Sequence, residues 1–231
     1  MTIQALEWDS AFFRMRIAKI DILTQRDFEE MLRCKNSLKK EYDLVYIFSN
    51  VKLDSLVDRM TLVDTKVVYR KSVETKHFLD PAIVRWGTPG VSSELLHLAL
   101  LSGAYSRFRI DKSFPPGSYE RLYTHWIKQS VNHTLATDVF CYMNEEQLPK
   151  GLITVDIKGD SGSIGLVSVD EDYRQKGMAS ALIRYAITYL YHYQIKDVSV
   201  VTQLANRPAC HLYEKNGFSL VSVTDIWHWW L

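Results

Sequence analysis

The chain has 231 residues, of which 47% are hydrophobic, so it can bury a sizeable core in one large domain or two small ones, and intrinsic disorder is excluded. Lysine and arginine number 28 against 27 acidic residues, and the formal net charge of +1 gives no global field to attract nucleic acid. The three cysteines, Cys34, Cys141 and Cys210, are isolated, so we expect a reducing compartment and no metal site. The N-terminus does not read as a signal peptide and no segment reads as a membrane span, so a cytoplasmic protein without a membrane partner is expected.

The first third of the chain alternates strands and helices. The expected order is a strand, a charged helix, an apolar strand, a short helix and a strand, over residues 16–23, 25–41, 43–49, 52–60 and 61–71. This succession predicts a sheet covered by helices. We therefore expect an αβ domain over residues 1–75.

Prolines and glycines cluster in residues 72–90, which predicts a linker at 76–90 and a second domain at 91–231. A helix is expected from Ser92 or Ser93 to about residue 101. A turn at 113–117 precedes a second helix. This second helix is expected over 118–131. Three strands are expected over 136–143, 150–157 and 162–169, with the last two joined as a hairpin.

Residues 169–179, Val-Asp-Glu-Asp-Tyr-Arg-Gln-Lys-Gly-Met-Ala, lead from a strand into an amphipathic helix. The helix has a single apolar stripe, formed by Ala179, Leu182, Ile183, Ala186, Ile187 and Leu190. Arg174, Lys176 and Gly177 bring positive charge and backbone N–H groups to its N-terminus. The first N–H groups of a helix lack internal partners and its dipole favours an anion, so the turn suits a phosphate or pyrophosphate.

A second motif follows a β-rich run at 197–202. Residues 206–218 read Asn-Arg-Pro-Ala-Cys-His-Leu-Tyr-Glu-Lys-Asn-Gly-Phe. Asn206 can cap a short helix that Gly217 ends, before a last strand at 218–230. The order of strand, asparagine, short helix and strand also occurs around Asn50. This similarity is either a coincidence or a partial duplication of the αβ unit. The aromatic end Trp227–Leu231 fills a core or forms the face of a homodimer.

The spacing Arg174-x-x-Gly-x-Ala179, followed by Asn206-x-x-Ala-x-x-Leu-Tyr213-x-x-x-Gly-Phe218, resembles the GCN5-related N-acetyltransferase (GNAT) superfamily. The resemblance implies an α/β (α+β) GNAT fold, a mixed central sheet flanked by helices, over residues 91–231. Residues 1–75 would then be a smaller αβ domain or a partial repeat of the same unit. An acetyl-CoA-dependent enzyme without a metal is implied.

The resemblance also implies roles for individual residues. The strand that ends at Val169 would contact the pantetheine arm of CoA and polarise the thioester carbonyl through a backbone N–H, and the next turn would bind the pyrophosphate. The implied acetyl-CoA-binding residues are Val167, Val169, Arg174, Gln175, Lys176, Gly177, Met178, Ala179 and Asn206. Asn206 binds CoA, caps its helix or does both, and the family often has glycine in place of Ala179. Tyr213 occupies the position of a tyrosine that protonates the departing thiolate; the alternative is a buried core aromatic.

Scattered stretches resemble the dTDP-fucosamine (dTDP-4-amino-4,6-dideoxygalactose) acetyltransferases: Leu6–Phe13, Ser106–Arg109 and Tyr123-x-x-Trp126-Ile127. They imply a nucleotide-linked amino-deoxysugar as acceptor and a place in the synthesis of lipopolysaccharide or another surface polysaccharide. Arg107 and Arg109 would hold the diphosphate, and Tyr123 would stack on the base or sugar. The alternative places these arginines on the surface and the aromatics in the core.

Two other functions stay open. The first is acetylation of another small amine, such as an aminoglycoside, a polyamine or an amino acid. The second is a non-catalytic acyl-CoA-binding module. No general base is assigned, because His125, His133, Asp156 and His211 are candidates by availability alone.

Overall fold

The computed structural model describes residues 2–53, 57–74 and 79–231, and the chain forms two compact units. The first unit comprises Met1–Val67, Gln203–Ala205 and Ser222–Leu231, and the second comprises Val68–Thr202 and Asn206–Val221. This division differs from the expected linker at 76–90. It falls inside a strand, and the end of the chain belongs with its beginning.

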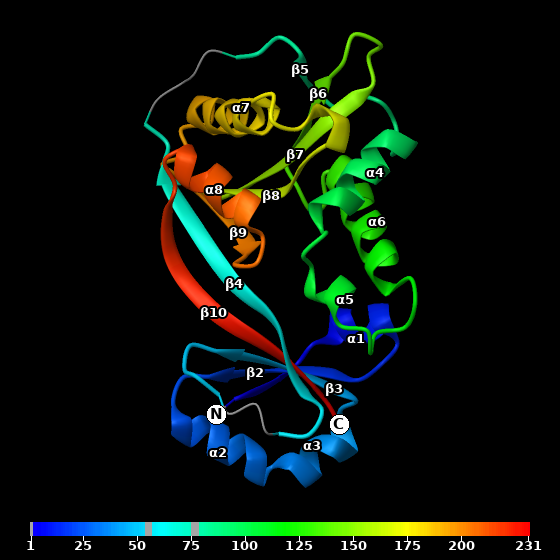
Figure 1. The fold of residues 1–231 in the computed structure, drawn as a ribbon, viewed down its shortest axis with the longest axis vertical. Helices are drawn as coiled ribbons and strands as arrows, with labels where there is room; N and C mark the ends of the chain where they lie inside the picture. The colour runs from blue at the N-terminus through cyan, green and yellow to red at the C-terminus, as the bar shows by residue number, and fades with distance from the viewer. Residues whose placement is uncertain (1, 54–56, 75–78) are drawn as a thin grey trace. The chain divides into compact units, whose positions relative to one another are not determined.

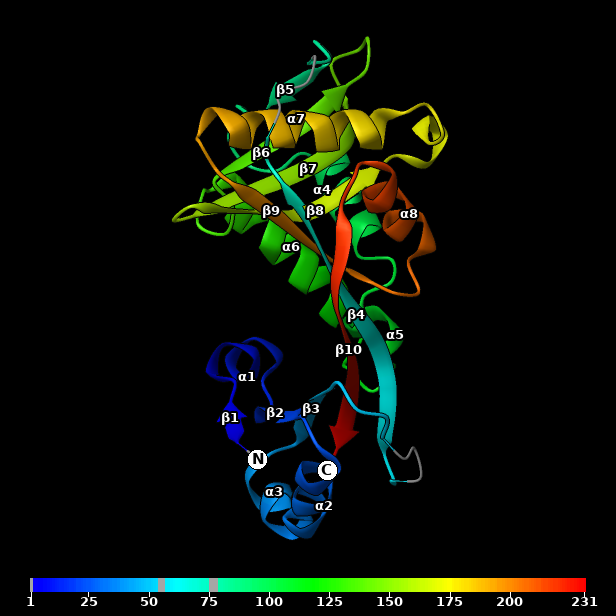
Figure 2. The same cartoon turned by 90° about the vertical axis from the view of Figure 1, so that its left-hand side faces the viewer.

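The first unit is a small mixed sheet with helices. Its elements are β1 (Ile3–Ala5), α1 (Glu7–Phe13), β2 (Ile17–Ile22), α2 (Gln25–Arg33), α3 (Lys35–Glu41), β3 (Leu44–Ser49), the first part of β4 (Met60–Ser72) and the last part of β10 (Ser219–Trp230). The strand order is β1-β2-β3-β10-β4 (Figures 1 and 2). β2 and β3 are parallel, whereas β1 with β2 and β10 with β3 are antiparallel.

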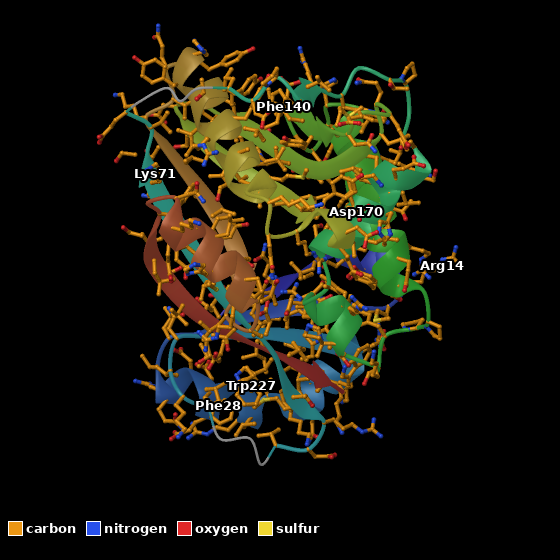
Figure 3. All side chains as sticks on the ribbon, turned by 45° about the horizontal axis from the view of Figure 1, so that its top comes forward. Arg14, Phe28, Lys71, Phe140, Asp170 and Trp227 are labelled. Carbon is orange, nitrogen blue, oxygen red and sulfur yellow. The ribbon has the colours of Figure 1, made fainter. Side chains whose placement is uncertain are left out.

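The aromatic C-terminus lies in the core of the first unit. Trp227 and Trp229 from β10 belong to one apolar cluster with Phe28 and Met31 from α2 and Ile47 from β3. Figure 3 labels Phe28 and Trp227 within this cluster. Of the two expectations for residues 227–231, the structure therefore shows core packing.

Several predictions for the first unit need correction. The helix expected over 25–41 is two helices separated at Cys34, whose backbone N–H bonds to the carbonyls of both Glu30 and Met31. The described residues of 52–60 are not helical, and 54–56 lie outside the described part of the chain. β1 and α1 were not predicted.

The second unit carries a larger mixed sheet. Its elements are the rest of β4, β5 (Ile83–Arg85), α4 (Ser93–Ser102), α5 (Arg107–Ile110), α6 (Ser118–Val131), β6 (Asp138–Met143), β7 (Pro149–Lys158), β8 (Ser161–Val169), the 3₁₀ turn η1 (Glu171–Tyr173), α7 (Met178–His192), β9 (Asp197–Gln203), α8 (Arg207–Lys215) and the start of β10. The strand order is β10-β4-β9-β8-β7-β6-β5, with β8 parallel to β9 and β5 to β8 antiparallel to one another. The predicted α/β class with a mixed sheet flanked by helices is confirmed, and β5 lies in the segment expected to be a linker.

Helices cover both faces of this sheet (Figures 1 and 2). A Cβ on Gly151 of β7 would lie 2.9 Å from Leu182 of α7, whereas the next residue, Leu152, packs with Leu98 of α4 and Ile127 of α6. Successive side chains of a strand point to opposite faces, so α7 lies across the sheet from α4 and α6. The turn between β8 and α7 therefore leads from the middle of the sheet to one of its faces.

Candidate active site

The two central parallel strands of the second unit separate along their length. Parallel pairing of β8 with β9 runs from Ser161 opposite Asp197 to Ile164 opposite Val200, and it does not continue among the described residues. β8 goes on to Val169, paired only with β7 on its other side. Among the described residues, one edge of 165–169 is thus left without a strand partner. Backbone groups on such an edge can bind an extended ligand that carries amides.

The turn after β8 is fixed at its first residue. The backbone N–H of Asp170, which Figure 3 labels, donates to the carbonyl of Lys150 at 2.9 Å. The Lys150 ammonium lies 3.2 Å from the Asp170 carboxylate. Partial burial opposes ionisation of Asp170, but the hydrogen bonds from Lys150 and from the backbone N–H of Asp172 outweigh it, so the pKa of Asp170 is lowered. The start of the turn is therefore tied to β7.

α7 begins at a bare N-terminus. Gly177 is its N-cap, with φ +82° and ψ −4°, and a glycine has no side chain with which to cap the helix. The first helical hydrogen bond runs from Ala181 N–H to the Gly177 carbonyl, so the N–H groups before it lack helical acceptors. A Cβ on Gly177 would have no neighbour within 4 Å among the described residues, so the positive φ, and not crowding, favours glycine. The start of this 15-residue helix therefore has N–H donors of the kind that bind anions, at an open position.

The two basic side chains of the turn fold back on it. Arg174 Nε donates to the Val169 carbonyl at 3.3 Å, and its guanidinium lies 3.4 Å from Glu171. Lys176 Nζ donates to the Asp172 carbonyl at 3.1 Å and lies over the ring of Tyr173. Both residues are exposed, so they shape the turn while adding positive charge beside the start of α7.

Tyr213 lies on α8 and is 4% exposed. Its ring packs against Tyr69 at 5.9 Å and Phe218 at 5.8 Å, measured between ring centroids. Burial, with a smaller contribution from nearby Cys210, raises the pKa of Tyr213, so the phenol keeps its proton at neutral pH. The structure is thus compatible with both expectations for Tyr213, a core aromatic and a proton donor.

Three polar contacts hold α8 in place. Asn206 caps it, accepting the backbone N–H of Ala209 at 3.2 Å, and the Tyr69 hydroxyl donates to Glu214 at 2.8 Å. The Asn216 amide donates to the hydroxyl of Ser180, in the first turn of α7, at 3.1 Å. The C-terminal end of the helix that carries Tyr213 is therefore linked directly to the first turn of α7.

The residues proposed for the acceptor lie around α5 and α6. Arg107 and Arg109 both lie on the helix α5. The Arg107 guanidinium covers the Phe108 ring, and the Arg109 guanidinium covers the Tyr119 ring. Tyr123 is 6% exposed and packs on Trp126. A Cβ on Gly103 would overlap the Tyr123 ring, which explains the glycine at the end of α4. Arg109 is therefore exposed, Arg107 is partly buried with its Nε inside the protein, and Tyr123 is mainly a packing residue.

Two of the four residues available as a general base, Asp156 and His133, have local partners. Asp156 accepts from the Thr137 hydroxyl and pairs with Lys158, and His133 Nδ1 is 2.8 Å from the Thr137 carbonyl. Within the described ranges, no group of three or more His, Cys, Asp or Glu side chains could hold a metal ion. None of the helices described is both long enough and apolar enough to cross a bilayer.

Sequence reasoning missed three polar residues of this region: Thr154, Glu214 and Asn216. Thr154 acts across the hairpin of β7 and β8 at an irregular position of their pairing, so no local pattern marks it. Glu214 and Asn216 lie inside the second motif, in the last turn of α8 and at its C-cap, and these positions could have marked them as contacts from α8 to its neighbours.

The comparisons with known proteins agree with this geometry. Residues 101–218, more than half of the chain, match the family described as the Acetyltransferase (GNAT) family. A stretch of 61 residues is 39% identical to the streptothricin acetyltransferase of Escherichia coli and covers 26% of this chain and 35% of that protein. A stretch of 65 residues is 32% identical to the mycothiol acetyltransferase of Propionibacterium freudenreichii and covers 28% of this chain and 20% of that protein. The matched stretches thus span about a third or less of these relatives.

Similarity to solved structures extends further along the chain. The GCN5-related N-acetyltransferase from Sphaerobacter thermophilus superposes with a TM-score of 0.61 over 98% of this chain and 75% of that one, at 14% identity. At that identity the likeness shows the fold alone. The separated strands, the bare start of α7 and the family match over residues 101–218 lead to one conclusion: the chain belongs to the acetyltransferase (GNAT) family and has its fold.

Proposed function

We propose that the chain is an N-acetyltransferase that moves an acetyl group from acetyl-CoA to an amine. The observation that carries the proposal is the course of β8, which leaves β9 after Ile164 and runs, through residues 170–177, to the uncapped N-terminus of α7. The free edge of β8, which can bind amides, is therefore followed along the chain by the start of α7, which can bind an anion. The family match over residues 101–218 supports the same activity.

The residues on this path fit acetyl-CoA, which supplies an activated acetyl thioester. Backbone groups of Val167 and Val169 would bind the amide-containing arm, and the N–H groups from Gln175 to Ala179 would bind the pyrophosphate. Arg174 and Lys176 would add their charge beside those N–H groups. A backbone N–H between Val167 and Val169 would polarise the thioester carbonyl, because a fixed donor is most effective where water is excluded.

Tyr213 would supply the proton for the departing thiolate. Its apolar surroundings raise the pKa of the phenol, which alone would make it a poor acid. The same surroundings disfavour an unpaired thiolate, so the phenol O–H would stabilise the departing sulfur by donating a hydrogen bond to it. If the proton passes to the sulfur, the proton released by the attacking amine would restore the neutral phenol.

As the acceptor we propose a nucleotide-linked amino-deoxysugar of the dTDP-4-amino-4,6-dideoxyhexose type, used for surface polysaccharide. Arg109 on α5 supports it, because an exposed guanidinium can bind a diphosphate. Arg107, two positions earlier, lies on another face of the helix. The second candidate is another small amine. The identity shared with an enzyme named for streptothricin favours that class.

The test measures thiol release from acetyl-CoA with a panel of amines, for the wild type, Tyr213→Phe and Tyr69→Phe. Loss of a general acid lowers kcat by about 10²-fold or more, so Tyr213→Phe should be slow while the neighbouring Tyr69→Phe keeps most of its kcat. Equal kcat in wild type and Tyr213→Phe would refute the acid role. Turnover of dTDP-amino sugars no faster than that of spermidine would refute the nucleotide-sugar acceptor, and binding of CoA without acetylation of any amine would indicate a binding module.

A further inference from the structure

Thr154, in β7, is a buried polar residue with no role in the chemistry proposed so far. It is 3% exposed, and its hydroxyl oxygen accepts the backbone N–H of Leu166 in β8 at 2.8 Å. In a regular antiparallel pair that N–H would bond to a backbone carbonyl of the neighbouring strand. A side chain therefore takes the place of a backbone acceptor in the middle of the sheet.

This substitution coincides with a β-bulge. Ile153 lies opposite Val167 and Val155 lies opposite Ile164, so a single β7 residue, Thr154, faces Gly165 and Leu166 together. The extra residue shifts the register and would leave the Leu166 N–H without a ladder partner. The Thr154 hydroxyl satisfies it, and a part-buried N–H left without an acceptor would be unfavourable.

The Thr154 hydroxyl occupies the space that a side chain at Gly165 would need. A Cβ at this position would lie 2.6 Å from Thr154 Oγ1, closer than any real contact of that kind. Any larger residue would therefore push the hydroxyl away from Leu166. The bulge therefore needs both a hydroxyl at Thr154 on β7 and a residue without a side chain at Gly165 on β8.

The bulge lies at the point where β8 leaves β9. The last parallel pair is Ile164 opposite Val200, and the bulge begins at the next residue. A bulge bends its strand and increases the local twist. The direction of the backbone at Val167 and Val169 is therefore set by the bulge that comes just before them.

We propose that Thr154 is a positioning residue for acetyl transfer: its hydroxyl holds the bulge at Gly165–Leu166 and so aims the backbone N–H groups of Val167–Val169 at the thioester carbonyl. The inference rests on the proposed function in one respect, that this part of β8 receives the acetyl thioester. Thr154 itself touches no reacting atom in this account. Its effect passes through the backbone of β8.

The test compares Thr154→Val, which keeps the branched shape and removes the hydroxyl, with Thr154→Ser, which keeps the hydroxyl. Each variant is assayed well below its own unfolding midpoint, for CoA affinity by calorimetry and for kcat with the best amine of the panel. The pyrophosphate site is unchanged in both, so CoA affinity should stay within about twofold. Small misplacement of a catalytic group can slow a reaction by up to about 10²-fold, and we expect kcat of Thr154→Val to fall about tenfold and that of Thr154→Ser to stay within about twofold.

A second readout does not depend on the amine. Amide chemical shifts of Val167–Val169 are compared with saturating CoA and with saturating acetyl-CoA, and their difference reports the acetyl group. We expect that difference in the wild type and Thr154→Ser, and its loss or reduction in Thr154→Val. Should Thr154→Val not fold, Gly165→Ala gives the same comparison, because its Cβ displaces the same hydroxyl.

The outcomes separate the two proposals. An acetyl-dependent shift that needs the hydroxyl supports the inference even if no amine is acetylated, and the proposed function alone then fails. The inference is overturned if the wild type shows no acetyl-dependent shift, if Thr154→Val keeps both the shift and kcat, or if Thr154→Ser loses as much as Thr154→Val.

Discussion

Replacing Gly177 by alanine separates the backbone role of this residue from its role at the proposed ligand site. Gly177 is the N-cap of α7 at φ +82° and ψ −4°, and Gly117 is the N-cap of the 14-residue helix α6 at φ +78° and ψ 1°. A Cβ at either position would have no neighbour within 4 Å among the described residues. Gly117→Ala is therefore a matched control with the same conformation and the same free space.

The structure gives the magnitude expected for each change. A residue with a Cβ in the left-handed region costs about 1–2 kcal/mol, and neither alanine adds a clash, so both variants should lose about that free energy of unfolding. Only Gly177 lies where the pyrophosphate is proposed to bind. A methyl group there would hold the phosphate away from the N–H groups, and CoA affinity should fall about tenfold or more, which is about 1.4 kcal/mol or more.

The assay pairs denaturant unfolding with calorimetric titration of CoA for the wild type, Gly177→Ala and Gly117→Ala. We expect similar losses of stability in the two variants and weaker binding in Gly177→Ala alone. Equal CoA affinity in the two variants would refute the placement of the pyrophosphate at the start of α7.

Three further predictions concern neighbouring groups. Asn206→Ala should lower the free energy of unfolding by about 1 kcal/mol through loss of the cap of α8, and unchanged CoA affinity in calorimetry would then assign Asn206 to capping alone. The pKa of Asp170 is lowered in the folded state, so the stability that its carboxylate provides is present above its unfolded pKa of about 3.9 and is lost as the pH falls through the folded pKa. The difference in unfolding free energy between the wild type and Asp170→Asn should therefore be constant from about pH 5 to 8 and shrink only in acid. A difference that shrinks at neutral pH would contradict the ion pair with Lys150. Burial raises the pKa of the Cys141 thiol to about 12, so at pH 8 iodoacetamide should modify the partly exposed Cys34 in the native protein and Cys141 only after denaturation, as peptide mass spectrometry would show.

Local patterns predicted the elements that local physics determines. α7 followed from a single apolar stripe, and α8 from its capping asparagine and the glycine after it, which has φ +80°. The three-residue strands β1 and β5 carry no usable periodicity, and the N-cap residue of α1, Leu6, makes no side-chain cap, so none of these elements was visible in the sequence.

Long-range pairing accounts for the remaining differences. The first unit takes its strand β10 from the other end of the chain, with Trp229 opposite Val45, and no linker composition reveals that exchange. The motifs at 169–179 and 206–218 indicated the anion site and the position of Tyr213. They could not show that Asn216 joins the two helices, or that Thr154 holds a bulge in β8, because each contact depends on a register set by the whole sheet.

Hydrogen exchange with and without acetyl-CoA, read by mass spectrometry at peptide level, tests the central claim most directly. If acetyl-CoA lies along the free edge of β8 and at the start of α7, added acetyl-CoA should slow exchange in peptides covering 165–169 and 175–180, and it should leave the hairpin at 158–162 unchanged. Protection confined to other segments, such as the hollow lined by Tyr191, His192 and Lys196 at the far end of α7, would contradict the account.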